Sequence, residues 1–352
     1  MQALTSSRQI ATKKLIEFGW DEPDTAFMRR HVAQMETTPF DGCVFHLNYT
    51  TADGRSANFT WECWSKRAFT EAELRPALEH LKATPFRRFK HNFLRFNTTP
   101  ADIDWFGDFS AVLNNARLAA RIAREGRCAG ILFDIEQYNE PLFNYQRQRD
   151  ADKKSWEEYA EQVRRRGREV MQAFQQGYPG LKVLLTFGYC LPWAQSQGGR
   201  RPLKECDYGL LAPFLDGMVD AASGRTRLID GHELSYGYRD PALFAKAYQT
   251  MKRDLLPIVA DPRKYARVFS FSFGIWMDLD WRNSGWHTDD LSKNPHPPSQ
   301  FEALAREALK VADEYVWIYS ETPRWWSEEG KPVKLPQEYI EALQRAKQGG
   351  GA

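Results

Sequence analysis

The sequence predicts an α/β fold in which one (β/α)8 barrel, the TIM-barrel architecture, occupies residues 1–352 as a single domain. Two observations carry this prediction. Eight short apolar runs alternate strictly with helical patterns, and no linker or low-complexity stretch divides the chain. Strict alternation predicts a parallel sheet, and eight units predict closure into a barrel. A doubly wound open sheet is the alternative, but no glycine-rich nucleotide-binding motif follows the first strand.

The expected strands are short runs rich in β-branched or aromatic residues, a composition typical of strands. They cover residues 15–20, 42–49, 91–97, 130–136, 182–189, 216–222, 267–276 and 315–321. The barrel is therefore expected to span about residues 14–347, with a disordered tail after residue 347. The longest non-helical stretches, 47–69 and 277–297, should form long loops on the carboxyl face of the barrel.

Helical patterns fill the gaps between these strands, and several begin with a capping residue. Asp24 can cap the first helix. Thr70 and Ser155 are each followed three residues later by a glutamate, which is the capping-box pattern. Another helix follows Ser110 and ends near Gly126. The remaining helices are expected over residues 203–214, 240–256, 298–312 and 336–347.

Composition and charge exclude several classes of protein. The 48 basic and 46 acidic side chains leave a formal net charge of +2, too small for the basic field of a nucleic-acid binder. No apolar run reaches the roughly 18 residues of a transmembrane helix, so no membrane insertion is expected. Residues 1–13 lack the apolar core of a signal peptide. The compartment stays open between the cytoplasm and export without a leader, and the oligomeric state also stays open.

The five cysteines are scattered and show no paired spacing, so free buried thiols are expected rather than disulfides or a zinc site. The seven histidines show no metal-binding spacing either. The sequence therefore predicts a protein with no metal and no cofactor.

Polar residues at the carboxyl ends of barrel strands are the expected site residues, because barrel enzymes build their active sites there. In strand order these residues are Trp20, Asp21 and Glu22; His46, Asn48 and Tyr49; Arg95 and Asn97; Asp134, Glu136, Gln137 and Tyr138; Tyr189; Asp220; Trp276 and Asp278; and Tyr319 and Glu321. Each alone could be a solvated loop residue. Together they would line one mouth with carboxylates, amides and aromatic rings.

The run GILFDIEQY (130–138) carries the most specific pattern. Strand alternation puts Asp134 and Glu136 on one face, pointing into the barrel mouth. Two neighbouring carboxylates cannot both ionise freely, so one pKa should rise, and a carboxyl that keeps its proton can act as a general acid. Glu136 is the expected acid/base and Asp134 the group that raises its pKa. The alternative is a carboxylate paired with Arg95 or capping the next helix.

The segment GILFDIE also resembles the fourth-strand signature DGxDxDxE of the family-18 chitinase-like glycoside hydrolases, although Ala129 and Leu132 replace two of its aspartates. The resemblance implies that Glu136 donates the proton and that Asp134 orients a substrate acetamide. Glycoside hydrolysis ordinarily needs a second carboxyl unless the substrate itself attacks. The candidates, in order, are Glu321, Asp278 and Glu233.

Tryptophan is unusually frequent, with 12 in the chain, and most lie in or near expected strand-to-helix loops. Core packing is one explanation, since Trp is largely buried on average, and it is expected for Trp156 and Trp317. The alternative is a set of flat faces for saccharide rings. The expected sugar platforms are Trp20, Trp276 and Trp325; Trp61, Trp64, Trp105, Trp193, Trp281, Trp286 and Trp326 share the loop position.

These patterns together predict an enzyme that hydrolyses a glycosidic bond in an oligo- or polysaccharide, with a carbohydrate as its partner. A barrel that binds glycans without cleaving them is one alternative. A lyase or isomerase acting on a sugar acid is another.

Overall fold

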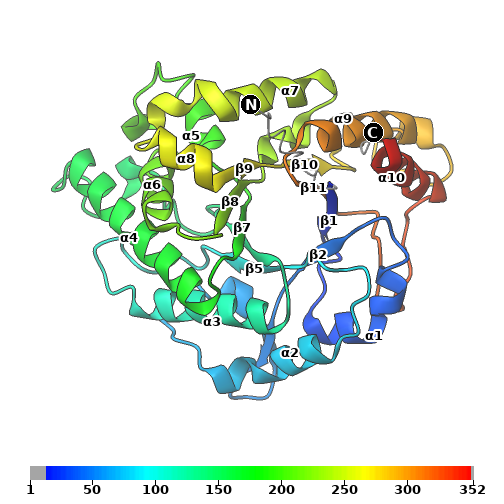
Figure 1. Cartoon of the computed structure of the whole chain (residues 1–352), viewed down its shortest axis with the longest axis horizontal. Coiled ribbons are helices and arrows are strands. Elements are labelled where there is room, and N and C mark those ends of the chain that lie inside the picture. Colours follow the sequence, from blue (N-terminus) through cyan, green and yellow to red (C-terminus); the bar gives the residue numbers. More distant parts are fainter. Residues whose placement is uncertain (1–12, 350–352) are drawn as a thin grey trace, which may run out of the picture.

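The computed structural model describes residues 13–349, and its centre is a parallel sheet that curls into a barrel (Figure 1). The strand order in the sheet is β10-β11-β1-β2-β5-β6-β7-β8-β9. The bounds are β1 (Lys14–Gly19), β2 (Gly42–Phe45), β5 (Phe93–Asn97), β6 (Gly130–Asp134), β7 (Lys182–Leu185), β8 (Arg227–Asp230), β9 (Phe269–Phe271), β10 (Phe273–Trp276) and β11 (Tyr315–Ser320).

The chain itself closes the ring, because β9 and β10 are separated only by Ser272. β9 pairs with β8, and β10 pairs with β11. The two segments therefore act as one interrupted strand, the seventh of eight. This arrangement confirms the predicted (β/α)8 barrel.

Helices surround the strands on the outside of the ring (Figure 1). Their bounds are α1 (Thr25–Met35), α2 (Glu71–Ala83), α3 (Ser110–Glu125), α4 (Trp156–Gly177), α5 (Cys190–Gln195), α6 (Leu211–Ala221), α7 (Ala242–Gln249), α8 (Pro262–Val268), α9 (Pro298–Val311) and α10 (Gln337–Gly349). Asp24 caps α1, and Thr70 and Ser155 begin α2 and α4 in capping boxes, as predicted.

Helix α10 continues to Gly349, past the expected start of a disordered tail. The rest of that tail and residues 1–12, on which the signal-peptide argument depends, lie outside the described residues. All five cysteines are buried and free, as predicted. Within residues 13–349, no helix combines the length and apolar character needed to span a membrane.

Inward-facing side chains from alternate strand positions fill the barrel. They include Ile16 and Phe18 from β1, and the set continues with Val44, Phe93, Leu132, Leu184, Ile229, Tyr315 and Trp317. A second and larger set of apolar side chains packs between the strands and the helices. Because the interior is packed, a ligand can enter only at the ends of the barrel.

The sixth strand lies later in the sequence than predicted. Residues 216–222 belong to α6, and the sixth strand is β8, RLID. α6 is apolar around most of its surface and buried against α4, so its short apolar run cannot be told from a strand by pattern alone. Asp220 consequently does not end a strand. It forms ion pairs with Arg164 and Arg168 of α4, at 2.8 and 2.9 Å.

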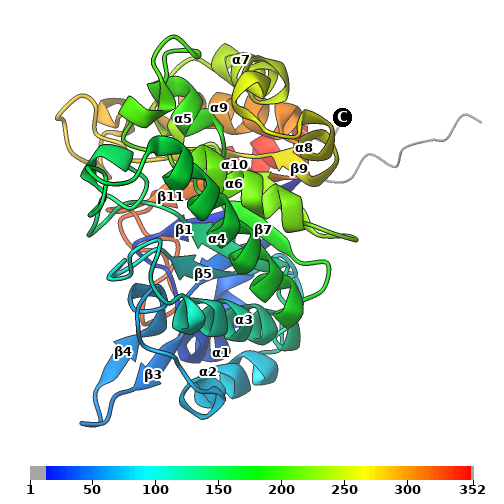
Figure 2. The same ribbon diagram turned by 90° about the vertical axis from the view of Figure 1, so that its left-hand side faces the viewer.

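The loop after β2 contains an antiparallel hairpin, β3 (Asn48–Thr50) and β4 (Ser56–Asn58). Figure 2 shows the hairpin extending from one end of the molecule. The chain returns from β4 to the barrel through a short 3-10 turn, Phe59–Trp61, whose first N–H groups are capped by Asn58. This return places Asn58 and Trp61 at the carboxyl face.

Candidate active site

A cavity of about 520 Å³ opens at the carboxyl ends of the barrel strands. Residues in or after every strand of the ring except β7 and β9 contribute to its wall. The lining residues are Phe18, Gly19, Trp20, Glu22, His46, Asn58, Trp61, Arg95, Glu136, Tyr138, Glu233, Tyr236, Trp276, Tyr319 and Glu321. Ten of the residues predicted from the sequence thus converge: Trp20, Glu22, His46, Arg95, Glu136, Tyr138, Glu233, Trp276, Tyr319 and Glu321.

A larger cavity, of about 730 Å³, lies between the loops that follow β5 and β6. Residues 101–111 and 140–149 provide most of its wall. Because only two neighbouring loops shape it, it lacks the convergence of many strand ends that marks barrel active sites. The smaller cavity is therefore the candidate site.

Arg95 links two carboxylates at the edge of this cavity. Its Nη1 lies 2.8 Å from Oε2 of Glu22, and its Nη2 lies 2.6 Å from Oδ2 of Asp134. Burial alone would raise the pKa of Glu22, but the charge of Arg95 and a hydrogen bond with His46 outweigh burial and lower that pKa. The guanidinium also lies 5.1 Å from the ring centroids of Phe18 and Trp61. The positive charge of Arg95 is thus balanced by the carboxylates of Glu22 and Asp134.

Asp134 is fully buried behind the cavity wall and does not line it. Besides Arg95, the hydroxyl of Tyr138 donates to its Oδ2 at 3.0 Å. Its Oδ1 accepts from the backbone N–H of Glu136 at 3.3 Å. The pairing with Arg95 was the alternative reading of this residue, and it is the one observed. Asp134 fixes the backbone of Glu136 and keeps a negative charge next to it.

Glu136 and Glu233 form a carboxyl pair in the cavity. Burial raises the pKa of Glu136 to about 7, and the charge of Asp134 adds to this effect. Burial, with the charges of Glu136 and Asp134, also raises the pKa of Glu233 well above its ordinary value. The two carboxyl groups lie close enough to influence each other's pKa. Both pKa shifts favour the protonated form, so the pair keeps a proton to a higher pH than ordinary glutamates do.

Glu321 occupies another part of the same wall. The hydroxyl of Tyr319 donates to its Oε1 at 3.2 Å, and the indole N–H of Trp20 donates to that hydroxyl at 3.1 Å. Burial and the charge of Asp278 raise the pKa of Glu321. Among the side chains that affect the pKa of Glu136, the strongest influences after burial come instead from Asp134 and Glu233. Glu233, placed last among the expected partners of Glu136, is therefore the carboxyl in contact with it.

Several other predicted residues support loops instead of lining the cavity. Asp278 accepts hydrogen bonds from the backbone of Glu321 and Thr322, at 3.1 and 2.8 Å. Asp21 accepts from the backbone of Trp325 at 2.5 Å. Asn48 donates to the capping residue Asp24 at 2.7 Å. Each of these polar side chains already forms hydrogen bonds within the chain, and these bonds hold the loops of the carboxyl face. Tyr49 and Gln137 also lie outside the lining set.

Three more predictions differ from the structure because the side chains are buried. Trp325 is 1% exposed and packs against Phe40, so it has no free face for a sugar ring. Tyr189 is fully buried and donates to Asp216 at 2.8 Å. Asn97 is also fully buried, and it does not line the cavity.

The tryptophans divide into two groups that loop position alone does not distinguish. Trp20 and Trp61 are 61% and 42% exposed and line the cavity. Four others expected on the rim are buried: Trp64, Trp105, Trp325 and Trp326. Their indoles are part of the hydrophobic core between the barrel and the surrounding helices. Core packing therefore explains a larger share of the tryptophan excess than expected.

Sequence reasoning missed Phe18, Asn58 and Tyr236 as lining residues. Phe18 could have been found from strand alternation, since it is two positions after the inward-facing Ile16. Tyr236 follows Glu233 by three residues in a helical turn, Glu233–Gly237. Asn58 gave no such signal, because the hairpin that brings it back to the barrel was expected only as a long loop.

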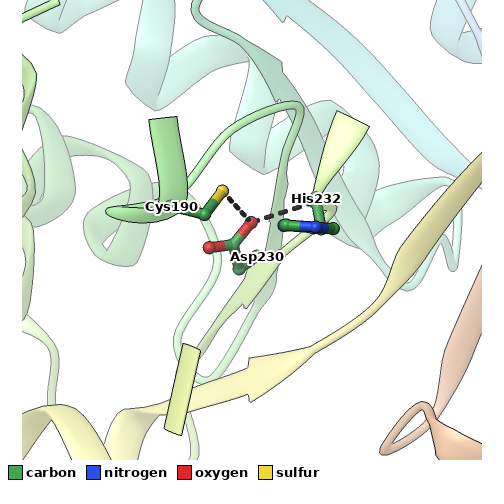
Figure 3. A group of neighbouring side chains, drawn as sticks. All are labelled: Cys190, Asp230 and His232. Carbon is green, nitrogen blue, oxygen red and sulfur yellow. Dashed lines mark hydrogen bonds between the residues drawn. The ribbon is translucent and has the colours of Figure 1, made fainter. Parts of the chain in front are cut away.

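One group of side chains offers donors that could hold a metal ion among residues 13–349: Cys190, Asp230 and His232, all buried (Figure 3). The Cys190 thiol donates to Oδ1 of Asp230 at 3.3 Å. The same oxygen accepts from the backbone N–H groups of Gly188 and His232, at 3.0 and 2.9 Å. Because Oδ1 of Asp230 accepts from three donors, the group forms a hydrogen-bonded cluster.

The chain matches no protein-family model and no curated protein sequence. Among solved structures it is similar to a broad-specificity endoglucanase of glycoside hydrolase subfamily 5-4 from Bacteroides salanitronis. That match has a TM-score of 0.51 at 10% identity and covers 95% of this chain and 93% of the other. In fold, the chain resembles family-5 glycoside hydrolases.

A trimodular endoglucanase of the same subfamily matches with a TM-score of 0.53 at 8% identity, over 97% of this chain and 61% of that one. This chain therefore spans about three fifths of the trimodular enzyme. At these identities the likeness to family-5 barrels shows the shared fold alone. The resemblance of the fourth strand to family 18 is not confirmed.

Proposed function

We propose that this chain is a glycoside hydrolase that cleaves a neutral oligo- or polysaccharide with the carboxyl pair Glu136–Glu233. The observation that carries the proposal is this pair of neighbouring carboxyls with raised pKa values, both lining one cavity at the strand ends of a barrel. A pair that can give a proton and also present a carboxylate is what glycosidic cleavage requires.

The nearness of the two carboxyls, each of which affects the pKa of the other, suits a retaining reaction better than an inverting one. Retaining enzymes hold their carboxyls about 5–5.5 Å apart, whereas inverting enzymes leave about 6.5–9.5 Å for a water molecule. Glu136 would protonate the leaving oxygen while Glu233 attacks the anomeric carbon, which breaks the glycosidic bond and forms an ester. Glu136 would then take a proton from water, and the water would displace Glu233 from the sugar.

The remaining wall suits an uncharged sugar. The exposed indoles of Trp20 and Trp61 offer flat apolar faces, while Glu321, His46 and Asn58 can exchange hydrogen bonds with hydroxyls. Arg95, the guanidinium among the lining residues, is already paired with two carboxylates. An acidic sugar would thus meet a mostly negative wall with no free arginine.

The direct test is incubation of the purified protein with a panel of soluble β-glucans, xyloglucan, mannan, xylan and chitooligosaccharides, followed by mass spectrometry. We expect new reducing ends and products whose masses sum to the substrate plus one water. Products that sum to the substrate alone would indicate a lyase. Binding without cleavage across the panel would leave a carbohydrate-binding barrel as the correct function.

Activity should decline on the basic side of neutrality. Burial, with the charge of Asp134, raises the pKa of Glu136 to about 7, so the proton of Glu136 is present below this pH and is lost as the pH rises through it. Because the leaving oxygen needs that proton, kcat/KM should fall about tenfold per pH unit above this point. The measurement is kcat/KM across the pH range on a substrate that the panel identifies. A profile that stays flat well above pH 7 contradicts the assignment.

A further inference from the structure

The turn that carries Glu233 is held from outside the barrel wall. β8 ends at Asp230, and only Gly231 and His232 separate it from Glu233. Ile229 points into the barrel interior, so the neighbouring Asp230 points outward, towards α5. A short segment thus joins a side chain buried outside the ring to one in the cavity.

Asp230 connects this turn to the loop that follows β7. Its Oδ1 accepts from the backbone N–H of Gly188 on one side and of His232 on the other, at 3.0 and 2.9 Å. The thiol of Cys190, at the start of α5, donates to the same oxygen (Figure 3). Asp230 is fully buried, and these contacts tie the exits of two adjacent strands to one atom.

Gly188 leaves the space that this arrangement needs. A Cβ at position 188 would lie 2.1 Å from Oδ2 and 2.4 Å from Cγ of Asp230. Real Cβ atoms do not approach other atoms so closely, so any side chain at this position would displace the carboxylate.

His232 adopts a backbone conformation that few residues other than glycine use. Its φ and ψ are 47° and 54°, in the left-handed region. The imidazole is 4% exposed, its Nε2 lies 3.0 Å from the hydroxyl of Tyr238, and its ring meets Phe273 edge-on. The next residue, Glu233, donates its backbone N–H to Thr186 at 3.1 Å. Contacts on both sides therefore hold the turn in a conformation that costs energy.

We propose that Gly188, Asp230 and His232 form a lock, here called the 188–230–232 lock, that positions Glu233 against Glu136. The three are positioning residues, since none of them lines the cavity. The inference rests on the proposed function, in which Glu233 reacts. The inference adds that this buried cluster outside the barrel sets the position of the Glu233 carboxyl group.

The test compares two glycine substitutions, Gly188→Ala and Gly237→Ala. Gly237 lies in the same loop as Glu233, but a Cβ there meets no atom within 4 Å, so Gly237→Ala is the matched control. A displacement of about 1 Å in a reacting group costs up to about 10²-fold in rate. We expect kcat of Gly188→Ala to fall by about this factor with KM little changed, while Gly237→Ala keeps the parent values.

The pH profile separates positioning from general damage. Glu233 lowers the pKa of Glu136, so moving Glu233 away should move the basic limb of kcat/KM to higher pH in Gly188→Ala. The other groups that face the pair, Asp134, Arg95, Tyr138 and Tyr236, are unchanged by the substitution. Equal pH profiles and equal kcat in Gly188→Ala and Gly237→Ala would overturn the lock.

Two further measurements keep the lock testable if Gly188→Ala does not fold or if no glycan is cleaved. Tyr238→Phe preserves shape and removes only the hydroxyl next to His232, and it should lower kcat severalfold. Carbon-13 NMR of labelled glutamate side chains follows the titration of the pair without any substrate, with assignment by Glu233→Gln. A wild type that cleaves nothing contradicts the hydrolase. Pair titrations identical in the wild type, Gly188→Ala and Tyr238→Phe contradict the lock.

Discussion

Replacing Glu136 by glutamine is expected to reduce kcat about 10²–10⁴-fold on a glycan whose leaving group is another sugar. Glutamine keeps the shape and the hydrogen-bonding reach of the side chain but cannot release a proton to the departing oxygen. A dinitrophenyl glycoside needs no such proton, so its bond-cleaving step should be much less affected. The measurement is the ratio of kcat values for the two substrates in the wild type and in Glu136→Gln.

The same pair of substrates distinguishes Glu136 from Glu233. Glu233→Gln removes the attacking carboxylate, so it should abolish turnover of both substrates. Glu79→Gln, on the exposed face of α2, is the control for the substitution itself and should keep wild-type rates. If Glu136→Gln hydrolyses the natural glycan at the wild-type rate, Glu136 is not the acid. If Glu233→Gln is the variant rescued by the activated leaving group, the two roles are exchanged.

Arg95→Met is expected to destabilise the fold by about 3–5 kcal/mol, because it leaves the carboxylates of Glu22 and Asp134 buried without their cation. The side chains of Glu22 and Asp134 are only 9% and 1% exposed, so water cannot compensate. The measurement is the free energy of unfolding in urea at neutral pH. An exposed pair supplies the control: Arg55 and Asp53 are bridged at 2.8 Å, and Arg55→Met should leave the free energy of unfolding close to the wild-type value because solvent screens exposed pairs.

The pH dependence of the stability lost in Arg95→Met tests whether the loss is electrostatic. The pKa of Glu22 is lowered in the folded protein, by the charge of Arg95 and the hydrogen bond with His46 against the effect of burial. The stability from this group is therefore present above the ordinary pKa of a glutamate, about 4.3, and is lost as the pH falls below it. The difference between Arg95→Met and the wild type should shrink over that range. A loss that stays constant into acid would mean that packing, not charge, explains the effect.

The sequence predicts the barrel well because its signals are local. Most strands are short, apolar and separated by capped helices, and three of the expected caps, Asp24, Thr70 and Ser155, begin helices in the structure. The sixth unit is the exception. β8 has only four residues, one of them the exposed Arg227, whereas α6 is more apolar than the strand itself. Hydrophobicity alone therefore selects the wrong segment.

The site is less predictable because distances between loops do not follow from local patterns. Glu136 stands out, since it follows a strand with a clear alternation. Glu233 follows a strand that was misplaced, so its contact with Glu136 could not be inferred. For Trp325 the loop position is right, but burial against Phe40 depends on packing between elements distant in sequence.

The seventh strand is interrupted at Ser272, so one part of the cavity wall lacks the backbone hydrogen bonds that join the other strands. β8 has no backbone ladder to β10, because its partner is β9. Across this seam, the hydroxyl of Ser235 donates to the carbonyl of Gly274 at 2.7 Å, two residues before Trp276. The segment that carries Glu233 and the strand that carries Trp276 are thus joined by the hydroxyl of Ser235. Other neighbouring strands of the barrel are joined by backbone hydrogen bonds. Widening the mouth at this seam would break this side-chain hydrogen bond, whereas widening it between paired strands would break a backbone ladder.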